Sequence, residues 1–159
     1  MAVIPGEDLA KIIEVLPKQI QPAGIDLTLH DILKFKCKGK LLDDNVVLPS
    51  VESLFKENTD TIHLTPGAYK VKFNEVIKIP SDCIGIVLPR SSLLRMGATI
   101  LTALWDPGYV GKGESLMVVF NQHGIVLKRN VRIAQLFLIK LTRTPSKLYC
   151  GRYQYEGLR

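Results

Sequence analysis

The sequence predicts an all-β fold with antiparallel strands, built as a barrel or a sandwich. From Gln19 onward, short runs of Val, Ile, Leu, Phe and Thr are interrupted every few residues by Pro, Gly, Asn or Asp, as in strands joined by turns. No long helical segment separates these runs, which argues against a parallel sheet with crossover helices. The chain has 159 residues, 47% of them hydrophobic, which can fill one core, and we expect a single domain over residues 1–159.

One short helix is expected before the strands, within residues 1–17. Glu7 and Asp8 favour the first turn of a helix over residues 5–16, and Pro17 ends it. The apolar residues of this segment recur at helical spacing, at Leu9, Ile12, Ile13 and Leu16.

The β-type runs then follow in order, with one long gap. Residues 41–60 are acidic and show no period, so we expect a long excursion between strands, and residues 142–159 form a C-terminal tail. In the segment before the gap, four lysines alternate with other residues and would share one solvated strand face, with a nucleic-acid stripe as the weaker alternative: Lys34, Lys36, Lys38 and Lys40. The expected strands are 25–29, 33–38, 67–73, 76–79, 84–89, 116–121, 125–128 and 133–141.

Composition excludes several functional classes. The longest apolar runs are far shorter than the ~20 residues that a membrane-spanning helix needs, and no signal peptide is apparent, so we expect a cytoplasmic protein with no membrane partner. The three cysteines and three histidines are scattered, which signals neither a disulfide framework nor a zinc site. The formal net charge of +6 is compatible with an anionic ligand.

Two stretches suit a phosphorylated ligand. Arg90, Ser91 and Ser92 follow an apolar strand, and a guanidinium with two hydroxyls can bind phosphate oxygens, although a helix cap with a surface arginine would look the same. Asp26 lies inside an apolar strand, where a carboxylate needs a partner or a metal-bound water, unless it only closes a turn.

Two further stretches carry groups for catalysis and recognition. Asp106 stands before a Pro-Gly turn and could act as a general base towards water, while Tyr109 could stack on a sugar or a base. The alternative is a plain β-turn with Asp at its first position. Gln135 interrupts an apolar strand, where its amide needs hydrogen-bond partners or an ordered water.

Taken in chain order, around Asp26, Arg90, Asp106 and Gln135, the four stretches resemble the dUTPase and dCTP deaminase superfamily, in particular dUTP diphosphatases of archaeal type. The resemblance covers nearly the whole chain and includes residues 65–71, Asn74-Glu75 and residues 149–154 of the tail. It implies a distorted jelly-roll-like β-barrel that assembles as a homotrimer with active sites between subunits. It also implies dUTP as substrate, Mg²⁺ as cofactor and no nucleic-acid partner.

The roles that the resemblance implies fall on matching residues. Asp106 would activate water for attack on the α-phosphorus of dUTP, giving dUMP and pyrophosphate, and Tyr109 would pack against deoxyribose. Asp26 and Gln135 would hold waters of the triphosphate-bound Mg²⁺. The substrate-binding residues would be Arg90, Ser91, Ser92, Arg95, Thr102, Ala103, Tyr109, Gln135, Arg152, Tyr153 and Gln154.

The sequence leaves the branch of the superfamily open. The interval from Arg90 to Asp106 is shorter than in the common dUTPases, and Arg95, Thr102-Ala103 and the tail look closer to the deaminases. However, the deaminase glutamate would stand three residues before Asn121, where this chain has Val118, and Glu114 is the only acid nearby. This favours a dUTP diphosphatase. The alternatives are a dCTP deaminase or bifunctional enzyme, and a catalytically silent nucleotide-binding protein on the same fold.

Overall fold

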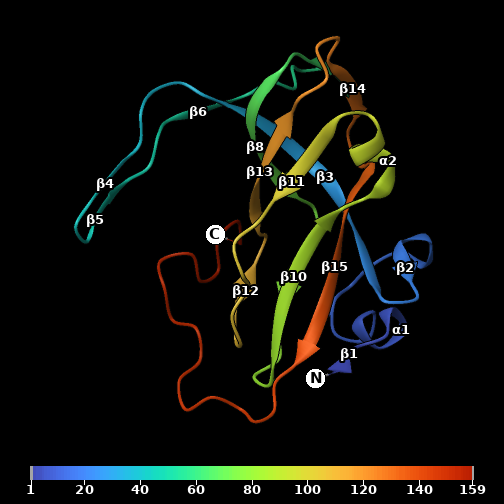
Figure 1. Ribbon diagram of the computed structural model, residues 1–159, viewed down its shortest axis with the longest axis vertical. Coiled ribbons are helices and arrows are strands. Elements are labelled where there is room, and N and C mark those ends of the chain that lie inside the picture. The colour runs from blue at the N-terminus through green and yellow to red at the C-terminus, as the bar shows by residue number, and fades with distance from the viewer. Residues whose placement is uncertain (1, 159) are drawn as a thin grey trace.

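The computed structural model describes residues 2–158, which form mainly short β-strands (Figure 1). Two short α-helices are present in this range, α1 (Gly6–Leu9) and α2 (Ser91–Arg95), with a 3₁₀ turn at Pro17–Gln19. The strands are β1 (Ala2–Val3), β2 (Ile20–Gln21), β3 (Gly24–Phe35), β4 (Lys40–Leu42), β5 (Asn45–Val47), β6 (Val51–Ser53), β7 (Thr61–Leu64), β8 (Gly67–Phe73), β9 (Ile77–Lys78), β10 (Cys83–Pro89), β11 (Ala98–Leu101), β12 (Val110–Gly111), β13 (Glu114–Val119), β14 (Ile125–Lys128) and β15 (Arg132–Lys140).

One large curled sheet dominates the fold. Its strand order is β1-β15-β3-β8-β13-β11, with β10 paired to β15 and with β2 and β6 paired to β3. Every strand pair of the described residues is antiparallel, as the sequence predicts. Along β8 and β13, buried and half-buried residues alternate, because successive side chains of a strand point to opposite faces. One face of the sheet therefore closes on an apolar core that includes Phe73, Met117 and Leu136.

The N-terminal helix is shorter than predicted. The periodicity indicates a helix over residues 5–16, but α1 ends at Leu9 and irregular turns follow. Leu9 and Ile13 are fully buried, whereas Ile12 and Leu16 are exposed. Two buried anchors hold this segment against the sheet, and a helix this short has little stability of its own, so tertiary packing decides where it ends.

The segment from β3 to β6 also differs from the prediction. The two strands expected at 25–29 and 33–38 form one continuous strand, β3, which ends at Phe35. The four lysines therefore do not share one strand, although all are exposed as predicted, and Lys36 forms an ion pair with Glu52 at 2.6 Å. The expected excursion at 41–60 contains the ribbon β4–β5, which projects from the body of the protein (Figure 1), and strand β6.

The C-terminal tail packs along the loop and short strand at residues 107–112. The described residues after β15 contain turns and no strand. Backbone hydrogen bonds run from Tyr155 N to Val110 O at 2.7 Å and from Lys112 N to Glu156 O at 2.8 Å. Among the described residues, no helix has the length and apolar character needed to cross a bilayer.

Candidate active site

Strand pairing brings three of the predicted site residues together. In the β3–β15 pair Asp26 lies opposite Gln135, and in the β10–β15 pair Gln135 lies opposite Leu88. Arg90 follows the end of β10, and its N–H donates to Ile133 O at 3.0 Å. Asp26, Gln135 and Arg90 therefore form one cluster on three adjacent strands, which we call the arginine cluster together with Arg132.

The Asp26 carboxylate is the centre of this cluster. Its side chain is only 2% exposed, and its Oδ2 accepts from Arg90 Nε and from Arg132 Nη1, both at 3.1 Å. Gln21 Nε2 also donates to Oδ2 at 3.2 Å. Burial raises the pKa of the Asp26 carboxyl, and the positive charges of Arg90 and Arg132 oppose this rise. The partner that a buried acid requires is thus a pair of arginines. Arg132 is a member of this cluster that the sequence pattern did not single out.

Helix α2 presents polar groups beside Arg90. Arg90 occupies the N-cap position with extended backbone, and no side chain makes a capping hydrogen bond. The cap explanation for Ser91 and Ser92 is therefore wrong, since both residues are exposed and lie inside the helix. Arg95 is exposed as well. These groups are accessible to an anionic ligand.

Asp106 and Tyr109 form a second cluster, on the turn before β12. The backbone is a turn as the alternative interpretation expected, because Tyr109 N donates to Asp106 O at 3.1 Å and Gly108 has a φ of 86°. The Asp106 side chain is nevertheless exposed. The Tyr109 ring is 3% exposed and stacks on Trp105, with ring centres 6.0 Å apart. Gly113 permits this arrangement, because a Cβ there would lie 2.3 Å from the Trp105 ring.

The tail completes this second cluster. The Tyr109 hydroxyl donates to Glu156 Oε1 at 2.8 Å, and the Tyr149 ring lies edge-on to Tyr109. Burial, together with the Glu156 carboxylate, raises the pKa of Tyr109. Burial also raises the pKa of Glu156, while the hydrogen bond from Tyr109 lowers it.

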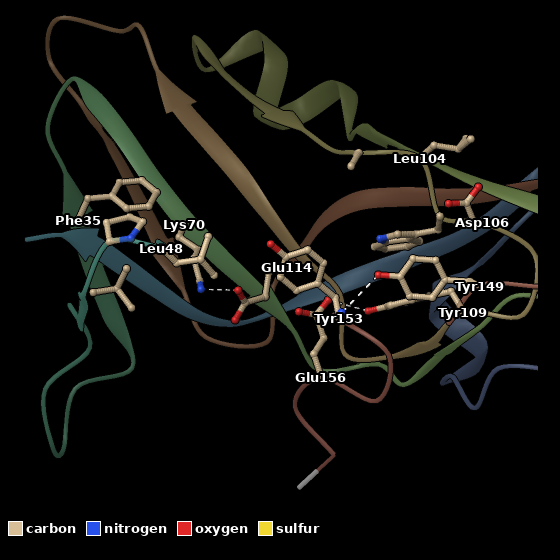
Figure 2. Close-up of a pocket in the computed structure, with 14 residues that line it drawn as sticks. Phe35, Leu48, Lys70, Leu104, Asp106, Tyr109, Glu114, Tyr149, Tyr153 and Glu156 are labelled. Carbon is tan, nitrogen blue, oxygen red and sulfur yellow. Dashed lines mark hydrogen bonds and ion pairs between the residues drawn. The ribbon is translucent and has the colours of Figure 1, made fainter. Parts of the chain in front are cut away.

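A cavity of about 270 Å³ opens beside Asp106 and Tyr109 (Figure 2). Its wall is largely apolar and aromatic, with an ion pair between Lys70 and Glu114. It is lined by Phe35, Leu48, Pro49, Val51, Lys70, Ala103, Leu104, Trp105, Asp106, Tyr109, Glu114, Tyr149, Tyr153 and Glu156. Lys70 was not predicted from the sequence, although a lysine among the apolar residues of β8 was a usable signal. Val118 does not line this cavity, whereas Glu114 does.

Other predicted residues have contacts within their own chain. Thr102 Oγ1 donates to Val87 O at 3.4 Å. Gln154 donates to Gly108 O at 2.9 Å and accepts from Val110 N at 3.0 Å, so its amide holds the tail to the turn. Arg152 Nη1 donates to Val46 O in β5 at 3.1 Å and does not line the cavity.

The arginine cluster and the cavity lie apart within one chain. Trp105 pairs with Gly85 near the start of β10, whereas Arg90 follows the far end of that strand. Five residues of strand correspond to about 16 Å. None of the cavity's described lining residues belongs to the arginine cluster.

Comparison with known proteins adds independent information. A family model described as dCTP deaminase-like matches residues 6–141. The probable deoxyuridine 5′-triphosphate nucleotidohydrolase of Methanosarcina acetivorans is 40% identical and is covered over 100% of both chains. The protein of the same description from Aeropyrum pernix is 42% identical over 87% of each chain.

Solved structures show the same fold. The 2′-deoxycytidine 5′-triphosphate deaminase from Agrobacterium tumefaciens matches 86% of this chain with a TM-score of 0.66 and 18% identity, and this chain spans about half (47%) of that one. The EIAV dUTPase matches 88% of this chain and 92% of its own with a TM-score of 0.54 and 16% identity.

Proposed function

This chain belongs to the dUTPase and dCTP deaminase superfamily, and we propose that it is a dUTP diphosphatase that hydrolyses dUTP to dUMP and pyrophosphate. The observation that carries the proposal is the joint placement of Asp106 and Tyr109 on one cavity, in a chain whose full-length relatives are described as deoxyuridine triphosphate nucleotidohydrolases. Such an enzyme limits uracil incorporation into DNA and supplies dUMP, and we expect it in the cytoplasm. We also assign its curled sheet to the distorted jelly-roll-like barrel.

The mechanism that we propose uses Asp106 as a general base. Its exposed carboxylate accepts a proton from a water molecule, whose oxygen attacks the α-phosphorus of dUTP. The bond to the oxygen that bridges the α- and β-phosphorus atoms breaks, and pyrophosphate leaves. The Tyr109 ring packs against deoxyribose and orients it, while the guanidinium of Arg90 and the hydroxyls of Ser91 and Ser92 bind phosphate oxygens.

The arginine cluster fits a Mg²⁺ ion that the triphosphate carries. Asp26 Oδ1 and the Gln135 amide have no hydrogen-bond partner among residues 2–158, so both can accept from metal-bound water. Within the part of the chain that the structure describes, no three acidic, His or Cys side chains gather to cage an ion on their own. Mg²⁺ retains waters and favours this kind of site, and when bound it would neutralise charge on the phosphates.

We further propose a homotrimer in which one active site draws on different subunits. The separation of Arg90 from Asp106 within one chain supports this arrangement. A second support is a group of large exposed apolar side chains on neighbouring elements, since such patches mark interaction surfaces. These side chains are Leu88, Leu94, Leu101, Leu104 and Phe120.

One incubation tests the proposed activity against the alternatives. The purified protein is supplied with Mg²⁺ and either dUTP or dCTP in ¹⁸O-labelled water. We expect dUMP and pyrophosphate from dUTP, with the label in dUMP only, and no ammonia from dCTP. Label in pyrophosphate, or release of dUDP and phosphate, would refute attack on the α-phosphorus. Ammonia from dCTP would establish a deaminase and direct attention to Glu114. Binding without turnover of either nucleotide would establish a silent binding protein.

A further inference from the structure

Lys70 and Glu114 place a cation and an anion side by side in the cavity wall. Val71 follows Lys70 in β8, Ser115 follows Glu114 in β13, and both are buried. Because successive side chains of a strand point to opposite faces, Lys70 and Glu114 lie on the face of the sheet that points away from the core. Their side chains form an ion pair and are only 23% and 28% exposed. The pair is therefore largely covered even though it lies on the outer face of the sheet, because the other walls of the cavity enclose it.

The pair lies at a definite place along the cavity. Figure 2 shows Asp106 at one end, Tyr109 and Tyr149 next to it, then Glu114, with Lys70 towards the opposite end beside Phe35. Under the proposed function, Asp106 acts at the α-phosphorus and Tyr109 contacts deoxyribose. The base of the nucleotide must then extend from Tyr109 towards Glu114 and Lys70.

We propose that Lys70 and Glu114 recognise the hydrogen-bonding edge of uracil and exclude cytosine, an inference that rests on the proposed function. The Lys70 ammonium can only donate, and the ionised Glu114 carboxylate can only accept. Lys70 donates to the O4 carbonyl of uracil, and Glu114 accepts from the N3–H group. Other aromatic and apolar residues of the cavity wall, including Phe35 and Tyr153, cover the faces of the base.

Cytosine presents the opposite pattern on the same edge. Its N4 amino group donates where uracil has O4, and its N3 atom accepts where uracil has N3–H. In the uracil pose, Lys70 would face a donor and Glu114 would face an acceptor, so both protein groups would lose a partner. A site built to hydrogen-bond one pattern discriminates strongly against a ligand that cannot supply it. Thymine differs from uracil only at C5, so this pair does not distinguish dTTP from dUTP.

Lys72 provides a matched control. It lies opposite Glu114 in the β8–β13 pair, with its Nζ 3.5 Å from Glu114 Oε1, but it does not line the cavity. Lys72→Met therefore removes a positive charge from the same carboxylate without removing a group that faces the base. A loss that arises from general electrostatics would appear in both lysine variants.

The test compares kcat/KM for dUTP, dCTP and dTTP in the wild-type enzyme and in the Lys70→Met and Lys72→Met variants. For Lys70→Met we expect the dUTP-to-dCTP ratio to fall by about tenfold or more, with the dUTP-to-dTTP ratio unchanged within about twofold. Lys72→Met should keep both ratios within about twofold. An unchanged dUTP-to-dCTP ratio in Lys70→Met, or an equal fall in Lys72→Met, would overturn the proposal.

Two further measurements separate this inference from the proposed function. Calorimetric binding of the α,β-imido analogues of dUTP and dCTP reports base selectivity without turnover. Selective binding that depends on Lys70, in a protein that does not hydrolyse dUTP, would refute the diphosphatase and retain the base recognition. The second measurement supplies the wild-type enzyme with the triphosphate of 3-methyldeoxyuridine, so it does not depend on a variant that folds. This substrate lacks the N3–H group, and we expect kcat/KM to fall by about tenfold or more relative to dUTP. Turnover equal to that of dUTP would overturn the role of Glu114.

Discussion

Removal of one hydroxyl group, by Tyr109→Phe, should loosen the C-terminal tail without removing the aromatic ring from the cavity. The hydroxyl donates to Glu156 Oε1 at 2.8 Å, and it is the only side-chain hydrogen bond that Glu156 receives among the described residues. The neighbouring backbone bonds, such as Tyr155 N to Val110 O at 2.7 Å, depend on the tail staying in place. The tail should therefore open more often in the variant.

The size of the effect follows from the hydrogen bond that is lost. A hydrogen bond to a charged group contributes about 1.5–3 kcal/mol, and we take the lower figure because Glu156 is only half-buried. About 1.5 kcal/mol corresponds to about a tenfold larger opening constant. Hydrogen exchange of the Tyr155 amide measures this opening directly. We expect exchange about tenfold faster in Tyr109→Phe.

The effect should depend on pH in a defined direction. Burial raises the pKa of Glu156 in the docked tail, so the docked state binds a proton more readily than the open state. Docking therefore weakens as pH rises from about 4.5, the ordinary pKa, through the raised pKa of the docked state. Tyr109 opposes this rise, so its loss raises the pKa of Glu156 further. The ratio of variant to wild-type exchange should be largest near pH 7.5 and should shrink as pH falls below about 4.5, where Glu156 becomes protonated in both the docked and the open tail.

The control is Tyr155→Phe, the same chemical change on an exposed tail residue whose hydroxyl has no hydrogen-bond partner among the described residues. The amide of Lys112, which donates to Glu156 O at 2.8 Å, is monitored in all three proteins, and its exchange in Tyr155→Phe should stay within about twofold of wild type. Equal exchange in Tyr109→Phe and wild type, or the same acceleration in Tyr155→Phe, would refute the role of the Tyr109–Glu156 bond.

Three further predictions concern catalysis, assembly and thiol reactivity. Asp106→Asn should lower kcat by roughly 10²-fold or more while calorimetry shows that dUTP still binds, and near-normal turnover would leave Asp106 as a turn residue only. Light scattering should give a mass of about three times 17.7 kDa. Mixing inactive Asp106→Asn chains with inactive Arg90→Ala chains should restore some activity. No recovery after proven subunit exchange would mean that both residues act from the same chain. Cys37 should react with iodoacetamide at pH 8 faster than Cys83. Hydrogen bonds with Ser50 lower the pKa of Cys37, whereas burial raises the pKa of Cys83 to about 11. Equal rates measured by mass spectrometry would contradict this prediction.

The strand positions could be predicted because they depend on local pattern. The predicted strands 67–73 and 125–128 match β8 and β14 to the residue, since each has a buried–exposed alternation and is closed by turn residues. The N-terminal helix and the ribbon β4–β5 could not be predicted in the same way. Their limits depend on what the rest of the chain covers, which a period in the sequence does not encode.

The residue types of the site were also determined by the sequence alone. Asp26, Arg90, Asp106, Tyr109 and Gln135 stand out as polar or aromatic residues next to apolar strands and turns. The magnesium ion and the homotrimer, which the resemblance implies, stay predictions.

Only the tertiary structure decided which of these groups meet. Sheet register joins Asp26 to Arg90 and Arg132, 64 and 106 positions away in the chain, and it keeps this cluster apart from Asp106. It also places Lys70 and Glu114 in one cavity wall. Antiparallel pairing of distant segments depends on the packing of the whole core, so residues that look like isolated surface charges in the sequence become neighbours only in the folded chain.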